Sequence, residues 1–380
     1  MMMHLAYCSD NEVFKKDQLR DQQWSYRFPG SGWVTCLYRM ASQSGVSLVS
    51  GDIAIANIAS KKWHPKDVYV IQEMESKDGS NLLALGANAF LITCLEAPIY
   101  APFFYDNIDR FAKNFKFSLG FGFSETLSEV PTSTKNIQFR FPSFYLEDML
   151  EVSLWQDRKK IVLVAANKYK TKQLFIPGNL SMMNVLRQLK SASWQARSAI
   201  YKKSLTLSLH DKRLEAIEYF IDKSTLGLYG SGWNAWDDLP ITWCKRLKNR
   251  INDYYFGLCQ NKLETVSEYQ FSICFENMIW PGYMTEKIID CFVAGTIPLY
   301  LGAPDIEAMI PKEAFIDMRN FSSFKQVESY MNSMTSDEAS VMINAGREYL
   351  QTAAGRLHSY EGFAENIMIT LLNNSTAIKS

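Results

Sequence analysis

Short apolar segments alternate with helical patterns along this chain, and the alternation occurs in two successive series. In the first third, five segments have the length and composition of strands: Asp52–Ile58, Val68–Gln72, Ala89–Cys94, Phe117–Phe121 and Ile137–Phe139. A helical pattern at Phe103–Asn114 separates two of them. Parallel strands need a crossover between them, and a helix usually supplies it. The first series therefore predicts a parallel α/β domain.

A second series begins at Ile161–Ala166, after a charged stretch. The pattern then gives, in order, a helix at Arg213–Asp222, a strand at Leu226–Tyr229, a helix at Lys262–Tyr269, a strand at Phe271–Phe275, a helix at Thr285–Ala294 closed by Gly295, and a strand at Ile297–Leu301. Residues from Asp337 to Leu372 are mostly helical in pattern. We expect an N-terminal α/β domain at 1–155, a second α/β domain at 156–355, and a C-terminal helix and tail at 356–380.

The composition fits two globular domains and excludes some partners. A chain of 380 residues with 47% hydrophobic residues has the length for two domains and enough apolar material for their cores. Forty Lys plus Arg balance forty Asp plus Glu, which argues against a protein that holds nucleic acid by bulk charge. No apolar run reaches the ~18–20 residues of a membrane span, and the first ten residues lack a secretory pattern. These features predict a cytoplasmic protein without a nucleic acid partner.

Cysteine and histidine do not form a recognisable framework. The seven cysteines and four histidines are scattered singly, without a Cys-x-x-Cys pair or a His-Glu-x-x-His helix. We therefore expect neither a disulfide framework nor a metal site built on these residues.

The segment from Phe271 to Lys287 places a strand, a polar turn and a helix start next to each other. Ligands of open α/β sheets bind at the carboxyl edge of the strands. Thr285 can cap the helix, which leaves Glu286 and Lys287 in a first turn that favours anions, phosphate above all. A bound phosphate would relieve the unfavourable position of Lys287, and Glu286 can accept hydrogen bonds from ribose hydroxyls. Taken alone, the same three residues also fit a solvated helix end.

A longer stretch is recognisable as a whole: Phe275-Glu-Asn277, Tyr283-x-Thr-Glu-Lys287 and Ala294-Gly-Thr-Ile-Pro-Leu-Tyr-Leu-Gly302. It resembles the α1,3/4-fucosyltransferases, glycosyltransferase family 10, and the missing anchor favours a bacterial-type member. In the first series, only Cys94-Leu-Glu96-Ala-Pro98 resembles the family, through a Glu-x-Pro element. The resemblance implies two Rossmann-like domains facing across a cleft (the GT-B arrangement), an inverting reaction without a metal, and GDP-fucose as donor.

The resemblance also implies roles for individual residues. The donor-binding residues would be Arg213, Asn277, Tyr283, Glu286 and Lys287, and the general base would be Glu96. Independently, a departing diphosphate needs cations, and the planar fork of an arginine suits phosphate oxygens. Glu96 lies at the end of a strand, where burial beside Leu95 and Pro98 would raise its pKa into a useful range.

Other interpretations of these residues stay open. Arg213 could be a surface cation paired with Asp211 or Glu215, and Glu96 could be structural, with Glu73, Glu75 and Glu125 as reserve candidates for the base. Glu276 could be a buried anchor for backbone N–H groups. Three tryptophans could line a base pocket or pack in the core: Trp233, Trp236 and Trp243.

The expected reaction is transfer of fucose to a hydroxyl of an oligosaccharide or lipid-linked glycan, such as a surface polysaccharide or lipopolysaccharide precursor, with an α-1,3-type linkage. Peripheral contact with the cytoplasmic face of the inner membrane would follow from such an acceptor. Two alternatives remain. Met278 stands where the family often has Ser or Thr, which leaves room for a transferase of another GDP-deoxysugar. A non-catalytic glycan- or nucleotide-binding protein with this fold is the other.

Overall fold

The computed structural model describes residues 3–20, 30–123, 134–168, 197–234 and 241–375, and it divides into two units. Unit 1 comprises Met1–Asp148 and Leu350–Ser380, and unit 2 comprises Met149–Tyr349. The first division thus falls at 148, where the sequence pattern suggests 155. The C-terminal residues belong to unit 1 because Phe363, Ile367 and Leu371 complete its core.

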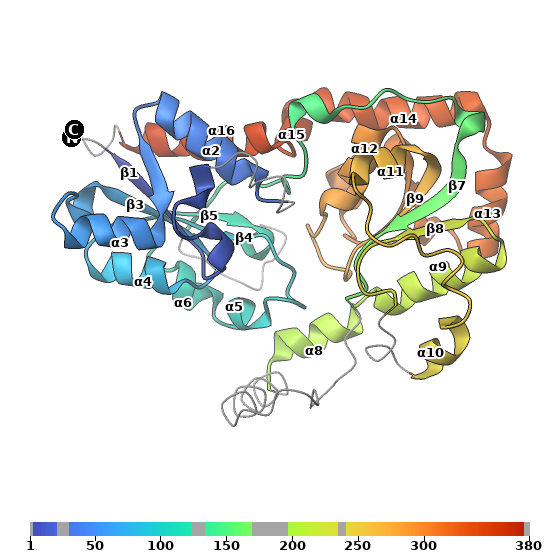
Figure 1. Ribbon diagram of the computed structural model, residues 1–380, viewed down its shortest axis with the longest axis horizontal. Helices are drawn as coiled ribbons and strands as arrows, with labels where there is room; N and C mark the ends of the chain where they lie inside the picture. Colours follow the sequence, from blue (N-terminus) through green and yellow to red (C-terminus); the bar gives the residue numbers. More distant parts are fainter. Residues whose placement is uncertain (1–2, 21–29, 124–133, 169–196, 235–240, 376–380) are drawn as a thin grey trace. The chain divides into compact units, whose positions relative to one another are not determined.

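Unit 1 contains a six-stranded parallel sheet in the order β2-β1-β3-β4-β5-β6. Its strands are β1 (His4–Cys8), β2 (Ser47–Ser50), β3 (Val68–Glu73), β4 (Asn88–Cys94), β5 (Phe117–Gly120) and β6 (Lys135–Asn136). Helices α2 (Gly32–Gln43) and α16 (Tyr360–Ser375) lie on one side of the sheet, whereas α3 (Gly51–Ala59) and α4 (Lys77–Ala84) lie on the other (Figure 1). Both faces of the sheet are therefore covered, as in a doubly wound domain.

Three strands predicted for the first series are confirmed as β3, β4 and β5, each within one residue at either end. The strand predicted at Asp52–Ile58 is wrong: these residues form helix α3. A short apolar run without clear alternation fits a buried helix as well as a strand, and here the helix follows directly on β2. The strand predicted at Ile137–Phe139 is also wrong, since β6 ends at Asn136.

Two other features of unit 1 depart from the sequence pattern. The pattern misses β1, a five-residue strand that is buried along its whole length. The helical pattern at Phe103–Asn114 corresponds to two short helices, α5 (Pro102–Asp106) and α6 (Ile108–Ala112), which are separated at Asn107.

Unit 2 contains a five-stranded parallel sheet in the order β11-β10-β9-β7-β8. Its strands are β7 (Lys159–Val164), β8 (Leu226–Tyr229), β9 (Tyr269–Phe275), β10 (Ile297–Leu301) and β11 (Ile316–Asp317). The helices are α8 (Ala199–Thr206), α9 (His210–Asp222), α10 (Ile241–Leu247), α11 (Lys262–Ser267), α12 (Glu286–Ala294), α13 (Phe324–Ser333) and α14 (Ser336–Gln351). The strands and helices predicted for this series are confirmed. Gly295 ends α12 with a φ of 71°, a left-handed conformation that suits glycine.

The two sheets share one strand order, and this order determines where a ligand can bind. In unit 1 the chain passes from β2 across β1 to β3, and in unit 2 it passes from β8 across β7 to β9. In open sheets of this kind, ligands bind where the order reverses, outside the carboxyl ends of the two central strands. Glu73 ends β3, and Glu276 directly follows β9. Each sheet therefore has a carboxylate at its switch point.

Candidate active site

Glu276 is the buried anchor of the site in unit 2. Its side chain is fully buried, and its backbone N–H donates to the carbonyl of Leu301 at 2.8 Å. Oε1 accepts from the Thr285 N–H at 2.8 Å, and Oε2 accepts from the Thr285 hydroxyl and from Lys287 Nζ, both at 2.8 Å. A buried carboxylate is stable only when it is paired and hydrogen bonded. Glu276 thus fixes the start of α12 against the end of β9.

Lys287 is held inside this network. Its side chain is 11% exposed, and Nζ donates to Thr285 Oγ1 at 2.7 Å as well as to Glu276. Thr285 occupies the N-cap position, yet its hydroxyl makes no capping bond to the helix because Glu276 and Lys287 engage it. A bound phosphate is therefore not required to offset the lysine at this helix start, since the Glu276 carboxylate already does so.

Glu286 lies between two lysines. Its Oε1 is 3.8 Å from Lys287 Nζ and 3.7 Å from Lys262 Nζ at the start of α11. Burial acts to raise the pKa of Glu286, but attraction to Lys287 and Lys262 outweighs it and holds the pKa well below the usual range. The side chain remains 35% exposed, so an ionised acceptor is available to a ligand's hydroxyl groups.

Arg213, Asn277 and Tyr283 form one chain of hydrogen bonds. The Arg213 side chain donates from Nη2 to the carbonyl of Phe275 at 2.8 Å and to Asn277 Oδ1 at 3.3 Å. Asn277 Nδ2 in turn donates to the Tyr283 hydroxyl at 3.1 Å. All three are buried, Arg213 to 2% exposure. The interpretation of Arg213 as a surface cation is therefore wrong, and the guanidinium instead holds the turn after β9.

Two other segments, the residues before α9 and the loop after β10, also hydrogen bond to the turn after β9. The Leu209 N–H donates to the Asn277 carbonyl at 3.1 Å, and the backbone of Ser208 pairs with that of Met278. Asp305 accepts from the Gly282 N–H at 2.8 Å. No sequence pattern indicates Asp305, because its role depends on how the loop after β10 meets this turn. Met278, the departure from the family pattern, is fully buried.

His210 is a residue that sequence reasoning missed. It is buried at the first position of α9, and burial, with repulsion from Arg213, Lys168 and Lys287, lowers its pKa to about 3. These cations come from the loop after β7 and from the starts of α9 and α12. Burial and three cations therefore act on this imidazole, and they keep it neutral in the folded chain. The available signal was its spacing, one helical turn before Arg213.

The candidate base in unit 1 has a different environment. Glu96 lies just beyond β4 at the carboxyl edge, as predicted, but it is exposed, so the expected burial is wrong. Glu73 is partly buried and accepts from the Tyr7 hydroxyl at 3.4 Å. Burial raises the pKa of Glu73, while hydrogen bonds from Ser9 and Tyr7 oppose the rise. Glu75 is exposed, and Glu125 lies outside the described residues.

The tryptophans pack in the core. Trp233 is 2% exposed and donates to the Ala165 carbonyl at 2.7 Å, and Trp243 donates to Asp211 at 2.8 Å. Both belong to the hydrophobic core of unit 2, and Trp236 lies outside the described residues. The base-pocket interpretation finds no support in the two that are described.

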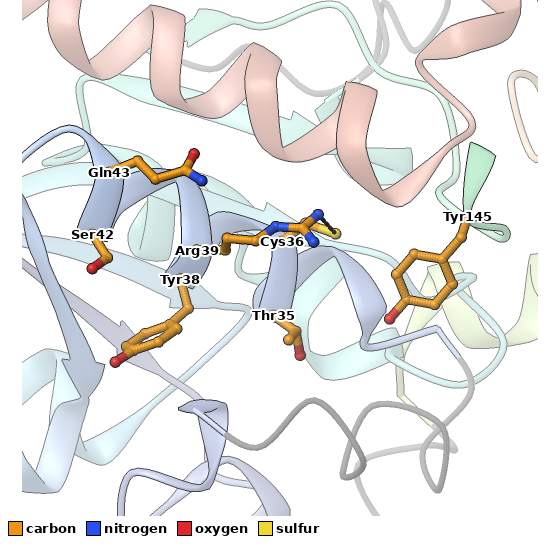
Figure 2. Close-up of a pocket in the computed structure, with 7 residues that line it drawn as sticks. All are labelled: Thr35, Cys36, Tyr38, Arg39, Ser42, Gln43 and Tyr145. Atoms are coloured by element: carbon orange, nitrogen blue, oxygen red, sulfur yellow. Dashed lines mark hydrogen bonds between the residues drawn. The ribbon is translucent and has the colours of Figure 1, made fainter. Parts of the chain in front are cut away.

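A hollow of about 290 Å³ lies on α2 in unit 1 (Figure 2). It is lined by Thr35, Cys36, Tyr38, Arg39, Ser42, Gln43 and Tyr145. None of the predicted site residues lines it, so the hollow is separate from the donor-site residues and from the candidate bases. Among the residues that the structure describes, no group of three or more His, Cys, Asp or Glu side chains is arranged to hold a metal. In the same part of the chain, no helix is long and apolar enough to cross a membrane.

Residues 208–344 match the sequence model of Glycosyltransferase family 10 (fucosyltransferase) C-term. This segment is a family 10 glycosyltransferase domain. It contains β8 to β11 and every donor-site residue predicted from the sequence.

Curated relatives of the family 10 domain are fucosyltransferases by name. Alpha-(1,3)-fucosyltransferase FucT of Helicobacter pylori is 30% identical over 121 residues, which cover 31% of this chain and 25% of that protein. The mouse 4-galactosyl-N-acetylglucosaminide 3-alpha-L-fucosyltransferase 9 is 29% identical over 110 residues, or 27% of this chain and 30% of the relative. The matched stretch therefore spans less than a third of either relative.

Solved structures resemble the whole chain. Anabaena Alr3699/HepE in complex with UDP and glucose superposes with a TM-score of 0.53 at 7% identity, over 98% of this chain and 99% of that one. A glycosyltransferase from Rickettsia africae ESF-5 gives a TM-score of 0.51 at 11% identity, over 97% of each chain. At such identities the likeness shows the fold alone. The predicted class, two Rossmann-like α/β domains of the GT-B type, is confirmed.

Proposed function

We propose that this chain is a glycosyltransferase that moves fucose from GDP-fucose to a hydroxyl of a glycan acceptor. One observation carries the proposal. Within the family 10 domain, two buried cations, Arg213 and Lys287, meet at the switch point of the sheet through Glu276, which accepts from Lys287 and whose backbone accepts from Arg213 at 3.3 Å. The names of the relatives of this domain support fucose as the transferred sugar.

The donor's charged and polar parts fit different residues of the site. Lys287 and Arg213, with His210 nearby, would attract the diphosphate and stabilise the charge that it gains as it leaves. Glu286 would accept from the ribose hydroxyls, since it is ionised and partly exposed. Asn277 and Tyr283 would keep the turn after β9 in place through their hydrogen bond. In this proposal, side chains supply the charge stabilisation, and transfer should persist in a chelator such as EDTA.

The transfer itself needs a base in unit 1. In an inverting reaction, the base takes the proton of the acceptor hydroxyl, the freed oxygen forms a bond to the anomeric carbon of fucose, and the bond from that carbon to the diphosphate breaks to release GDP. We assign the base to Glu96, at the carboxyl edge beyond β4. Glu73 is the rival, because its carboxyl is partly buried and its pKa is raised. The α-1,3 linkage follows the names of the relatives.

The test is a transfer assay with purified protein, GDP-fucose and a panel of oligosaccharide acceptors, read by GDP release and by the mass of the product. We expect a product heavier by one deoxyhexose. Consumption of a different GDP-deoxysugar in place of GDP-fucose would support the alternative donor. Saturable donor binding without turnover on any acceptor would support the non-catalytic alternative.

The proposal extends to the acceptor and its place in the cell. We infer a lipid-linked precursor of a bacterial surface polysaccharide or lipopolysaccharide, met at the cytoplasmic face of the inner membrane by a cytoplasmic enzyme. The singly scattered cysteines support a reducing compartment. Fractionation of cells should recover the protein in the cytoplasm with a share on inner-membrane vesicles, and recovery from the periplasm would contradict this location.

A further inference from the structure

Lys262 bridges two acidic residues of α12. It is the first residue of α11, a helix that begins after Asn261, whose side chain accepts from the Leu263 N–H at 3.0 Å. Lys262 Nζ lies 2.5 Å from Asp290 Oδ2 and 3.7 Å from Glu286 Oε1. The cap of α11 therefore places this lysine against the first turn of α12.

Without a cation between them, Glu286 and Asp290 would repel each other. They are four residues apart on α12 and so lie on the same side of the helix. Burial raises the pKa of Asp290 to about 6, Lys262 opposes the rise, and Glu286 adds to it. Asp290 is only 6% exposed and Glu286 is 35% exposed. Lys262 thus compensates a buried charge and a ligand-accessible charge at once.

Lys287 alone does not fix Glu286. Its ammonium is 2.8 Å from Glu276 and 2.7 Å from the Thr285 hydroxyl, but 3.8 Å from Glu286. Its hydrogen bonds therefore point to the buried network. The short contact of Lys262 is likewise with Asp290, at 2.5 Å, and its ammonium lies 3.7 Å from the same Glu286 oxygen. Glu286 is therefore restrained by attraction to two anchored cations, one on each helix, and Lys262 is the second of them.

We propose that Lys262 is a positioning residue that orients Glu286 toward the ribose hydroxyls of a bound guanosine diphosphate. This inference rests on the proposed function, which supplies the nucleotide and the role of Glu286. Lys262 would thus contribute to the preference for a ribose with free hydroxyls without touching the ligand itself. A carboxylate restrained between two cations loses little freedom when it binds, whereas an unrestrained one must be ordered first.

The test compares two ligands on three proteins by calorimetry. The ligands are GDP and 2′,3′-dideoxyguanosine 5′-diphosphate, which lacks the ribose hydroxyls. Wild type should prefer GDP about tenfold or more, the scale of a hydrogen bond to a charged group. Lys262→Met should weaken GDP about 3- to 10-fold and leave the dideoxy ligand within about twofold of wild type. Lys262→Arg, which keeps the charge, should restore the preference.

A matched control is Lys223→Met, which removes another paired lysine of unit 2, 3.3 Å from Glu328 and beyond the end of α9. It should change neither affinity, because it touches no part of α12. Thermal unfolding of all variants shows whether they fold.

The other outcomes overturn the inference in distinguishable ways. Equal losses for both ligands in Lys262→Met would assign the lysine to phosphate binding or to packing of α11 on α12. If Lys262→Met still prefers GDP over the dideoxy ligand as wild type does, Glu286 does not need Lys262 to bind the ribose. A wild type that binds GDP but does not distinguish the ligands would also remove the role of Glu286. A wild type that does not bind GDP would remove the proposed donor.

Discussion

Glu73 in unit 1 and Glu276 in unit 2 occupy equivalent places, each at the carboxyl end of a central strand where the strand order reverses. Their surroundings differ. Glu276 is fully buried and receives three hydrogen bonds, one of them from Lys287. Glu73 receives a long hydrogen bond of 3.4 Å from Tyr7 and a second one from Ser9, and neither donor is charged.

The difference shows how one topology serves two kinds of chemistry. A buried carboxylate that is paired with a lysine holds its neighbours in place, which suits a rigid binding site. Burial raises the pKa of Glu73 above its usual range, a shift that is common among groups with acid–base roles. The contrast agrees with the proposed function, which assigns the donor to unit 2 and the acceptor-side base to unit 1.

The largest expected effect separates the two candidate bases in unit 1. Glu96→Gln should lower kcat for transfer about 10²- to 10⁴-fold, because the acceptor hydroxyl loses its base, while the affinity for GDP-fucose stays within about twofold. Glu73→Gln is the matched variant and should retain most of the activity. Steady-state kinetics with a fixed acceptor measures both. The reverse pattern, an active Glu96→Gln and an inactive Glu73→Gln, would move the base to the switch point.

The next effect concerns stability and compares the two carboxylates directly. Glu276→Gln should lower the free energy of unfolding by about 3–5 kcal/mol, because Lys287 keeps its charge without a buried partner. Glu73→Gln should cost about 1 kcal/mol or less, since the amide oxygen can still accept from Tyr7 or Ser9 and no charged partner is left unpaired. Urea unfolding gives both values. Similar losses in the two variants would mean that the carboxylates play the same structural part.

Lys287 should matter for GDP binding as well as for folding, because Lys287→Ala also leaves the buried Glu276 carboxylate without its cation. Lys287→Ala should weaken GDP binding by about 1–3 kcal/mol, the scale of one charge-assisted contact. Lys212→Ala is a suitable control, because this lysine pairs with Glu215 at 2.7 Å on the exposed side of α9. Calorimetry should show no change for the control. If Lys287→Ala bound GDP as tightly as wild type, Lys287 would have only a structural role, through its contacts with Glu276 and Thr285.

A smaller effect concerns the pH dependence of the free energy of unfolding. Each unit contains one buried histidine that should contribute to it. Burial lowers the pKa of His358 in unit 1 and of His210 in unit 2 to about 3. The unfolded chain binds a proton at each histidine below about pH 6.5, whereas the folded chain does not until about pH 3. The free energy of unfolding should therefore fall by about 1.4 kcal/mol per pH unit for each histidine as the pH drops through this range.

Substitution separates the two contributions. His358→Asn and His210→Asn should each show a shallower loss of stability between pH 7 and pH 5.5 than wild type, by about 1.4 kcal/mol at the lower pH. Denaturant unfolding at the two pH values measures it. A variant whose stability falls as steeply as wild type would show that its histidine titrates normally in the folded chain.

The sequence predicted the local features of the site and missed those that depend on distant contacts. The strand at Phe271–Phe275 and the helix that starts after Thr285 are strong local patterns, and they are confirmed. The partner of Lys287 was eleven residues away at Glu276, yet only the fold turns that carboxylate toward it. Lys262 reaches Glu286 because α11 packs on α12, which no spacing in the sequence indicates.

The errors in unit 1 have the same origin. The segment Asp52–Ile58 has no clear apolar period, so its pattern did not separate a helix from a strand. Strand β1 has only five residues near the chain start, and its central place in the sheet comes from pairing with β2 and β3. The exposure of Glu96 depends on how the loop beyond β4 lies, which its apolar neighbours in sequence do not determine.

Binding of GDP-fucose by the family 10 domain, at the switch point of the unit 2 sheet, is the step on which the proposed reaction depends. Calorimetric titration of the full chain with GDP-fucose, and with UDP-glucose as the comparison ligand, tests it most directly. We predict saturable binding of GDP-fucose with at least about a tenfold preference over UDP-glucose, and loss of most of that binding in Lys287→Ala. Tighter binding of UDP-glucose, or GDP-fucose binding that Lys287→Ala leaves intact, would contradict it.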